Sequence, residues 1–401
     1  MLIVHKYGGT SVGSLERIES VASRVAKAKK EGNDIVVVVS AMSGETNKLT
    51  DYAKHFSDNP SKREMDMLLS SGEIVTASLL AIALKEMGLD AIAMTGGQAG
   101  IKTDTFHTYA RIESIDPTAM QNELNSGKVV IVAGFQGVNS NGEITTLGRG
   151  GSDLSAVAIA GALKADACEI YSDVDGIYTT DPRIEPKAKK MDYISYEEML
   201  ELASLGAKVL QNRSVELAKK LKVKIVAKSS FSNAEGTVIG KESGKMEAVL
   251  VSGIALDRNQ ARVSLRDVSD RPGIAAEIFT KLAEEQINVD MIIQNASSDG
   301  LTSLGFTVTQ SELAKAKEII ENFDHDIGGK SFDNDICKVS IVGVGMKSHS
   351  GVAATAFSAL AKENINIEMI STSEIKVSMI IAEKYAELAV RTLHSIYELD
   401  K

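Results

Sequence analysis

The chain has 401 residues, of which 44% are hydrophobic and 24% are charged, and only five are prolines. This balance is typical of a folded protein with two or three domains and argues against long disordered segments. The formal net charge is -10, and no Lys/Arg cluster is interleaved with aromatic residues, which disfavours nucleic acid and anionic membranes as partners. We therefore expect small-molecule ligands.

The N-terminus "MLIVHKYGG" has no basic segment, only a short apolar run and no small-residue cleavage site, so we expect no signal peptide. We also expect no later segment to reach transmembrane length. Cys168 and Cys337 each lie in an apolar, strand-like run and are predicted to be core residues, not a disulfide or metal pair. Together these features predict a cytoplasmic location.

The first half of the sequence alternates strand and helix patterns. The runs at 2–6 and 34–40 are continuously apolar, as parallel strands buried on both faces require. Between them apolar residues recur at helical spacing from Leu15 onward. Further strand candidates are residues 91–95, 128–134, 168–172 and 224–229. Helical patterns at 154–164 and 197–219 separate some of them, so we predict an α/β fold with a mostly parallel sheet and helices on both faces.

The opening stretch "HKYGGTSVGS" places Gly8 and Gly9 between the first strand and the first helix. Glycines there let the backbone approach a ligand, and amides entering a helix can bind a phosphate. A tight turn without a ligand is the alternative. The sequence "GGKS" at 328–331 matches only the end of the P-loop pattern G-x-x-x-x-G-K-[ST]. The position of the first glycine of the pattern is occupied by Asp324, so the pattern is absent.

A second glycine cluster, "TTLGRGGSD", surrounds Arg149 directly before a helical pattern, with Ser152 or Asp153 able to cap that helix. Such a helix N-terminus beside a fixed cation is a candidate anion site. A capped helix that binds nothing remains the alternative.

A third polar segment, "YSDVDGIYTTDPR" at 171–183, follows a buried strand. In open α/β sheets, ligands bind beyond the carboxyl ends of strands. Carboxylates in this loop could hold Mg²⁺ through water, and Tyr178 and Arg183 could flank a nucleotide. Taken alone, the segment could equally be a polar surface turn.

The second half contains an internal repeat after a linker at 240–246. Residues 263–292 and 339–370 share the order strand, glycine turn, helix, strand, with Gly273 and Gly351 paired at an offset of 78 residues. A constant offset indicates two copies of one module, each too small to bury its face well alone.

Several ordered motifs together resemble the aspartate kinase family. They are "KYGGTSV", "SAMSGETN", "SGE" at 71–73, "TTLGRGGSD", "SDVDGIYTTDPR" and "GAKVLQNRSVE". The resemblance implies a three-layer amino-acid kinase fold followed by two ferredoxin-like (ACT) α+β regulatory domains. We expect the domains at 1–245, 246–336 and 337–401, with a strand at 247–256 that completes the second ACT domain.

The resemblance also implies roles for individual residues. The expected catalytic residues are Lys6, Arg149 and Asp153. Aspartate binding is expected from Thr46, Glu73, Arg149 and Ser152. The expected nucleotide contacts are Lys6, Gly8, Gly9, Thr10, Ser172, Asp173, Tyr178, Arg183 and Lys208. The expected effector contacts are Asp270, Gly273, Ile274, Asp290, Met291, Gln294, Val352, Ile367, Glu368, Thr372 and Ser373.

The activity implied by the resemblance is transfer of the γ-phosphoryl of ATP, with Mg²⁺, to the side-chain carboxylate of L-aspartate. We expect lysine, threonine or both to inhibit, and copies of the chain to associate through the ACT domains. A carboxylate nucleophile is already ionised at pH 7, which fits the lack of an obvious catalytic histidine. The alternatives are a kinase for glutamate, acetylglutamate or UMP, and an inactive amino-acid sensor.

Overall fold

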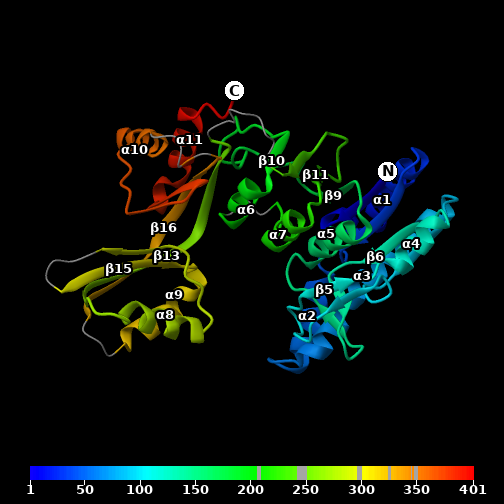
Figure 1. The fold of residues 1–401 in the computed structure, drawn as a ribbon, viewed down its shortest axis with the longest axis horizontal. Coiled ribbons are helices and arrows are strands. Elements are labelled where there is room, and N and C mark those ends of the chain that lie inside the picture. Colours follow the sequence, from blue (N-terminus) through cyan, green and yellow to red (C-terminus); the bar gives the residue numbers. More distant parts are fainter. Residues whose placement is uncertain (206–208, 242–250, 296–299, 324–326, 345, 347–350) are drawn as a thin grey trace. The chain divides into compact units, whose positions relative to one another are not determined.

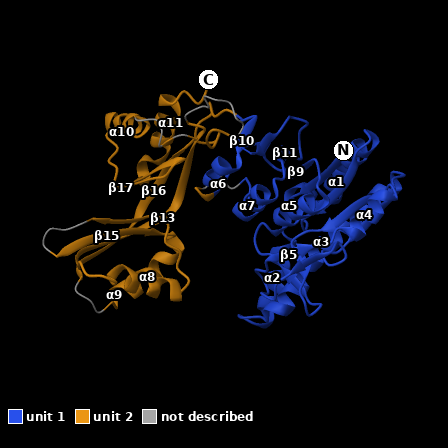
Figure 2. Cartoon of the chain, viewed as in Figure 1, with its two compact units in different colours: residues 1–177, 190–203, 208–245 blue, residues 178–189, 204–207, 246–401 orange. Residues whose placement is uncertain are grey.

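The structure is a computed structural model, and it describes residues 1–205, 209–241, 251–295, 300–323, 327–344, 346 and 351–401. The chain forms two compact units, which Figure 2 distinguishes by colour. Unit 1 comprises Met1–Ile177, Lys190–Ala203 and Lys208–Lys245. Unit 2 comprises Tyr178–Lys189, Ser204–Ala207 and Met246–Lys401. Each unit is described by itself.

Unit 1 is built on an eight-stranded sheet with the order β10-β12-β11-β9-β1-β2-β6-β3. Figure 1 labels β10, β11, β9 and β6 of this sheet. All its pairings are parallel except that of β11 with β12. The strands are β1 Leu2–Tyr7, β2 Asp34–Val39, β3 Ala91–Met94, β6 Val129–Ala133, β9 Ala167–Ser172, β10 Tyr193–Ser195, β11 Ile225–Ser229 and β12 Thr237–Gly240. The apolar runs predicted as strands are confirmed, and so is the mostly parallel sheet.

Helices cover both faces of this sheet. Those of unit 1 are η1 Gly9–Val12, α1 Leu15–Lys30, α2 Glu45–Phe56, α3 Lys62–Glu86, α4 Thr118–Asn125, α5 Gly151–Leu163, α6 Tyr196–Ser204 and α7 Asn212–Leu221. Helices α1 and α3 share a core with Tyr7 and Val37. Helix α5 packs on β1, β2 and β9. Because side chains alternate along a strand, Lys6 points to the face opposite Tyr7, which is the face of α5.

Two expectations about the helices are wrong. The helical pattern at 197–219 forms two helices, α6 and α7, not one. No segment was expected to reach transmembrane length, but helix α3 is 25 residues long and, by length and composition, apolar enough to cross a membrane. However, Leu80 and Leu84 are fully buried in the main core of unit 1, and Asp66 and Glu73 are buried in the same helix. Its apolar residues therefore make α3 a core helix.

A small second sheet in unit 1 was not predicted. Its order is β5-β4-β7-β8, with β5 Ile112–Ile115, β4 Ile101–Thr103, β7 Gln136–Val138 and β8 Ile144–Thr146. The antiparallel pair β7 and β8 leads directly into the segment that carries Arg149.

Unit 2 contains a six-stranded sheet with the order β14-β15-β13-β16-β18-β17, and all its pairings are antiparallel. The strands are β13 Gly253–Ser269, β14 Ile292–Asn295, β15 Leu301–Val308, β16 Ile327–Val342, β17 Met369–Thr372 and β18 Lys376–Ala382. The helices are α8 Ile274–Glu284, η2 Gln310–Glu312, α9 Leu313–Glu321, α10 Val352–Lys362, η3 Glu383–Tyr385 and α11 Ala386–Ile396. The predicted repeat is confirmed, because α8 and α10 begin and end 78 residues apart.

Strands β13 and β16 run through both copies of the repeat. Ile254 and Leu256 pack in the core with α10, whereas Val263 and Leu265 of the same strand pack in the core with α8. The strand expected at 247–256 is thus continuous with the first strand of the repeat. Its residues 247–250 lie outside the described residues.

Both cysteines are free and buried, as predicted. Burial raises the pKa of the Cys337 thiol to about 12 and also raises the pKa of Cys168. Neither thiol is therefore a reactive nucleophile near neutral pH.

We predict that a cavity in either copy of the repeat loosens both copies. Leu282 and Leu360 occupy equivalent, fully buried positions, and replacing either with alanine should lower the free energy of unfolding by about 2–5 kcal/mol. Because β13 and β16 are shared, amide exchange should accelerate in α8 and α10 in both variants. Acceleration confined to the copy that carries the substitution would contradict this prediction.

Candidate active site

A pocket of about 420 Å³ lies in unit 1 where β1, β2 and β6 end and α5 begins. Its lining residues are Lys6, Gly9, Ser40, Ala41, Met42, Ser43, Gly44, Thr46, Glu73, Phe135, Gly148, Arg149, Gly150, Gly151, Ser152, Asp153, Val209 and Gln211. Parallel strands bring their carboxyl ends to one edge, which is the usual ligand edge of an open α/β sheet. The pocket thus joins two of the three clusters that the sequence singled out.

Lys6 is the cation at the base of this pocket. It lies near the end of β1, is 8% exposed, and its Nζ is 2.6 Å from Asp153 Oδ1 in the first turn of α5. This contact is an ion pair without hydrogen-bond geometry, because Asp153 Oδ1 makes no hydrogen bond with any described residue. A Cβ at Gly8 would lie 3.3 Å from Lys6 Nζ, so the glycine leaves room around the ammonium.

Glu73 supplies a buried carboxylate from α3. Its Oε1 accepts a hydrogen bond of 3.0 Å from Ala41 N, whereas its buried Oε2 has no partner among the described residues. Burial raises the pKa of Glu73 to about 7, although the bond from Ala41 opposes this shift. Gly72 allows the close approach, because a Cβ there would lie 2.8 Å from Ala41 Cβ. The Oε2 atom can therefore accept a hydrogen bond from a ligand.

Arg149 lies between two glycines whose backbones are left-handed, with φ of 77° at Gly148 and 73° at Gly150. A Cβ at Gly150 would also lie 2.0 Å from Gln211 Cγ, so no other residue fits. Arg149 is exposed and forms no ion pair within the described part of the chain. Its guanidinium is therefore available to an anionic ligand.

The capping prediction at this helix is wrong. Gly150 occupies the N-cap of α5, and no side chain caps the helix there. Ser152 and Asp153 lie in the first turn instead, where a carboxylate is favoured by the helix dipole. The turn thereby aims the Asp153 side chain at Lys6 rather than at its own backbone.

Among the described residues of unit 1, the nucleotide candidates Thr10, Ser172 and Asp173 do not line the pocket. Thr10 is exposed and its carbonyl accepts a hydrogen bond from Arg17. Ser172 is the last residue of β9, the strand that pairs with β1. Its hydroxyl accepts a hydrogen bond of 3.3 Å from Val174 N. Asp173 is exposed after β9, Tyr178 and Arg183 belong to unit 2, and Lys208 lies outside the described residues.

The effector candidates lie in equivalent positions of the two repeats. Asp290 is ion-paired with Lys338, and Glu368 with Arg262, so cations of the two central strands hold both acids. Ser373 Oγ accepts a hydrogen bond of 3.4 Å from Ile375 N. The others are Asp270 in the turn before α8, Gly273 at the N-cap of α8, Ile274 and Val352 at the first positions of α8 and α10, Met291 and Gln294 beside or in β14, Ile367 before β17 and Thr372 at its end.

The expected site residues did not include the backbone that forms one wall of the pocket, although the motif "SAMSGETN" covers it. Residues 40–44 follow β2 and approach η1 closely, since a Cβ at Gly9 would lie 3.0 Å from Ala41 O. Phe135 and Gln211 were also missed, and Phe135 has a left-handed backbone with φ of 67°. The run of small residues after a buried strand was the pattern that could have indicated the wall.

Comparison with known proteins identifies the family of the chain. Residues 1–228 match the amino acid kinase family, and residues 265–322 and 339–397 each match the ACT domain. The chain is 60% identical over 405 residues to the aspartokinase of Helicobacter pylori (strain J99 / ATCC 700824), with 100% of both chains covered. The chain belongs to the aspartokinase family. An aspartate kinase of Pseudomonas putida is 54% identical, with 100% of this chain and 98% of the relative covered.

Solved aspartokinase structures share the fold. E. coli aspartokinase III in complex with aspartate and ADP, in the R-state, is 26% identical, with a TM-score of 0.79 and 99% of both chains covered. The same enzyme in complex with lysine and aspartate, in the T-state, has a TM-score of 0.78, with 98% of this chain and 99% of that chain covered. The family membership makes this chain an aspartate kinase enzyme with a repeated ACT domain.

We predict that Glu73 makes aspartate use pH-dependent. With its pKa raised to about 7, Glu73 loses its charge as the pH falls through neutrality, and a neutral carboxyl binds an ammonium weakly. The value of kcat/KM for aspartate should therefore fall about tenfold per pH unit well below that pKa. A pH profile from 5.5 to 8.5 checks this, and the Glu73→Gln variant should lack the transition.

Thermal stability gives an independent reading of the same group. Because the folded pKa exceeds the ordinary carboxyl value of about 4.3, ionisation of Glu73 lowers the free energy of unfolding as the pH rises from there to about 7. Glu73→Gln should then raise Tm relative to wild type more at pH 8 than at pH 5. A flat activity profile with equal Tm shifts would contradict the prediction.

Proposed function

We propose that the pocket binds L-aspartate between Arg149 and Glu73 and transfers the γ-phosphoryl of ATP to its side-chain carboxylate, giving 4-phospho-L-aspartate. The carrying observation is that one pocket combines the Lys6–Asp153 pair, an unpaired guanidinium at Arg149 and a buried carboxylate oxygen of Glu73 without a partner. This set provides a group for each charge of the reactants. The reaction is the entry to lysine, threonine and methionine synthesis.

The amino acid is held by opposite charges. The planar guanidinium of Arg149 suits a carboxylate of aspartate, because its fork of donors matches two oxygens. The free Oε2 of Glu73 suits the ammonium group, and ligand binding would then favour the ionised form of Glu73. Thr46 and Ser152 line the same pocket and can donate hydroxyl hydrogen bonds.

Phosphoryl transfer needs positive charge more than a base, because an anionic nucleophile approaches an anionic triphosphate. Lys6 Nζ lies at the end of β1 beside the N-terminus of α5, whose dipole also favours negative charge. Gly8 leaves space for phosphate oxygens near that ammonium, and Gly9 lets the backbone of η1 approach Ala41. Nucleotide contacts from Thr10, Ser172, Asp173, Tyr178, Arg183 and Lys208 remain part of this proposal.

Mg²⁺ is expected to accompany ATP. No cluster of three or more potential metal ligands occurs among the described residues. Mg²⁺ at phosphates commonly takes one or two protein carboxylates and several waters, and it supplies charge that offsets the triphosphate. Asp153 is a buried carboxylate of the pocket that could serve as one such ligand, although its Oδ1 contacts the Lys6 ammonium at 2.6 Å and would have to turn from it.

Other readings of the kinase fold are less well supported. Kinases for glutamate, acetylglutamate or UMP do not account for the full-length identity to aspartokinases or for the two ACT matches. An inactive amino-acid sensor would not need the Lys6–Asp153 pair or the unpaired Arg149. An ATP-consumption assay with L-aspartate separates these possibilities.

Regulation is proposed to come from the ACT repeats, where lysine, threonine or both bind and favour a less active state. A lysine complex of E. coli aspartokinase III in the T-state supports this proposal. Within unit 2, Thr179 joins the second half of the motif at 171–183 to the repeats: its Oγ1 lies 2.9 Å from His394 Nε2, and its carbonyl accepts a hydrogen bond of 2.7 Å from Ile254 N. We further propose a cytoplasmic homo-oligomer associated through the ACT domains.

We predict that the purified chain phosphorylates L-aspartate and that Lys6→Met lowers kcat by about 10²-fold or more. Methionine keeps the length of the side chain but not the charge that stabilises the transferring phosphoryl group. The measurement is ADP release, with L-glutamate as the substrate control and circular dichroism as the folding control. Wild-type turnover in the folded variant would remove Lys6 from the reaction.

A further prediction concerns the effector site at the end of β17. Thr372→Ala or Ser373→Ala should raise the inhibitor concentration for half inhibition, because an effector can shift the equilibrium only by differential contacts with the two states. Uninhibited kcat should stay within about threefold. Titration with lysine, threonine and both together checks this, and unchanged inhibition in both variants would place the effector elsewhere.

A further inference from the structure

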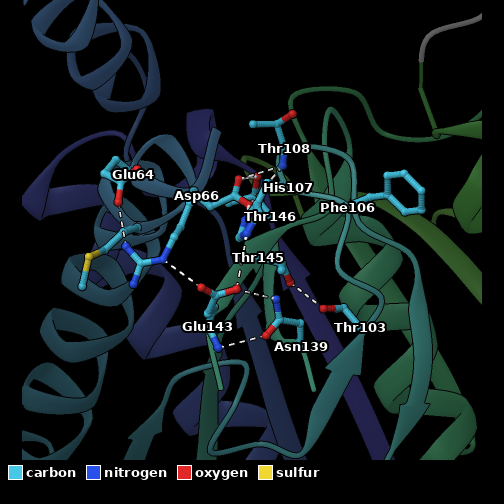
Figure 3. A network of polar contacts seen from close by, with 12 residues as sticks. Glu64, Asp66, Thr103, Phe106, His107, Thr108, Asn139, Glu143, Thr145 and Thr146 are labelled. Carbon is cyan, nitrogen blue, oxygen red and sulfur yellow. Dashed lines mark hydrogen bonds and ion pairs between the residues drawn. The ribbon is translucent and has the colours of Figure 1, made fainter. Parts of the chain in front are cut away.

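A buried polar network in unit 1 is not used by the mechanism above (Figure 3). Its centre is Asp66 on α3, which is 0% exposed. The carboxylate accepts hydrogen bonds from Thr108 N, 3.0 Å from each oxygen, and from Thr146 Oγ1 at 2.5 Å. His107 Nδ1 lies 2.7 Å from Asp66 Oδ2. Three groups from two other segments thus converge on one carboxylate.

Thr108 is held in a strained conformation. Its φ of 68° is left-handed, which is a genuine outlier for a β-branched residue. Such strain persists only where the surroundings fix the backbone, and it gathers at functional sites. The hydrogen bonds from Thr108 N to both oxygens of Asp66 provide that restraint.

Further contacts extend the network to the turn between β7 and β8. His107 Nε2 lies 3.6 Å from Glu143 Oε2, and Arg63 Nε lies 2.9 Å from Glu143 Oε1. Figure 3 shows Glu143 and Asn139 below His107, joined by hydrogen bonds. The segment around Thr108 is therefore fixed from two directions.

This strained segment packs directly on the Arg149 loop. A Cβ at Gly148 would lie 2.5 Å from the ring of Tyr109 and 3.4 Å from Thr108 O, so the two backbones are in close contact. Ala110 N also donates a hydrogen bond of 2.9 Å to the carbonyl of Thr146, which lies two residues before Gly148. A shift of Thr108 or Tyr109 must therefore displace the loop.

Arg213 on α7 locks the two segments together. Its guanidinium donates to Leu147 O at 2.6 Å and to Ala110 O at 3.0 Å, and it lies 4.7 Å from the centroid of the Tyr109 ring. Leu147 immediately precedes the glycine of the Arg149 loop. The position of Arg149 is thus coupled through backbone contacts to the buried Asp66.

We propose that Asp66 is a positioning residue for aspartate binding: by holding Thr108 in its strained conformation, it fixes the Arg149 loop. This inference rests on the proposed role of Arg149 as the carboxylate-binding group. Asp66 and Glu73 lie two turns apart on α3, so one helix would set the distance between the groups that bind the two ends of the amino acid.

The test is a kinetic comparison of Asp66→Asn with wild type. Asparagine keeps the shape of the side chain, but its NH₂ group is a hydrogen-bond donor and would face Thr108 N or Thr146 Oγ1, which are donors too. The strained segment at Thr108 should therefore relax. We expect KM for aspartate to rise about tenfold or more, as displacement of a binding group by about 1 Å can do, with KM for ATP within about twofold. A merely structural role would instead change both constants together or neither.

A second substitution tests the role of strain. Glycine adopts a φ of 68° without cost, so Thr108→Gly should leave KM for aspartate near the wild-type value on its own. Added to Asp66→Asn, it should restore a large part of the lost aspartate affinity. Failure of this rescue would overturn the strain-based coupling.

Glu198→Gln is the matched control. Glu198 on α6 is also a buried carboxylate that accepts from a backbone amide and a hydroxyl, at 3.0 Å from Ser195 N and 2.6 Å from Ser195 Oγ, but it does not line the pocket. The loss of the Glu198 carboxylate in this variant should lower Tm and leave KM for aspartate unchanged. An equal rise of KM in this control would show a general effect of destabilisation and overturn the proposal.

If Asp66→Asn does not fold, Thr146→Val removes only one bond of the network and should raise KM for aspartate by a smaller factor. Unchanged KM in a folded Thr146→Val or Asp66→Asn enzyme overturns the positioning role while wild-type activity on aspartate upholds the proposed function. Absence of activity in wild type would instead overturn the proposed function itself.

Discussion

The buried ion pair between Lys6 and Asp153 is the interaction around which the candidate active site is organised. Its two charged atoms lie 2.6 Å apart with both side chains about nine-tenths buried, and such charges are tolerated only when they are paired. The pair therefore ties the end of β1 to the first turn of α5. It also places an ammonium beside the helix N-terminus, where the two positive fields add.

Around this pair, several backbones approach one another more closely than side chains would permit. A Cβ at Gly134 would lie 3.0 Å from Ser152 and from Val38, and one at Gly151 would lie 2.9 Å from Leu147 and Phe135. The glycines consequently act as packing residues that draw β2, β6 and α5 together. Such close packing resists a shift of one segment, because the side chains of its neighbours already fill the space.

The sequence predicted the features that depend on local pattern. Apolar runs identified the central strands, and α1 was evident because Ile18, Ala22 and Val25 recur on one buried face. Helix α3 was missed because polar residues such as Asp66 and Glu73 are buried while apolar residues such as Ile82 are exposed, which obscures helical periodicity. The small sheet has strands of three or four residues, too short to show alternation.

The site was predicted in part for the same reason. Glycine clusters pointed to Lys6 and to Arg149, and family resemblance added Glu73. Asp66 could not be found in this way, because its partners Thr108 and Thr146 are 42 and 80 residues distant and form no motif. The same limit applies to the two acids proposed for the effector sites, because their partners are cations of other strands. Asp290 and Glu368 already bind Lys338 and Arg262 on β16 and β13. An effector ammonium at either acid would compete with a cation of a strand that both repeats share, and this competition would couple occupancy of one repeat to the packing of the other.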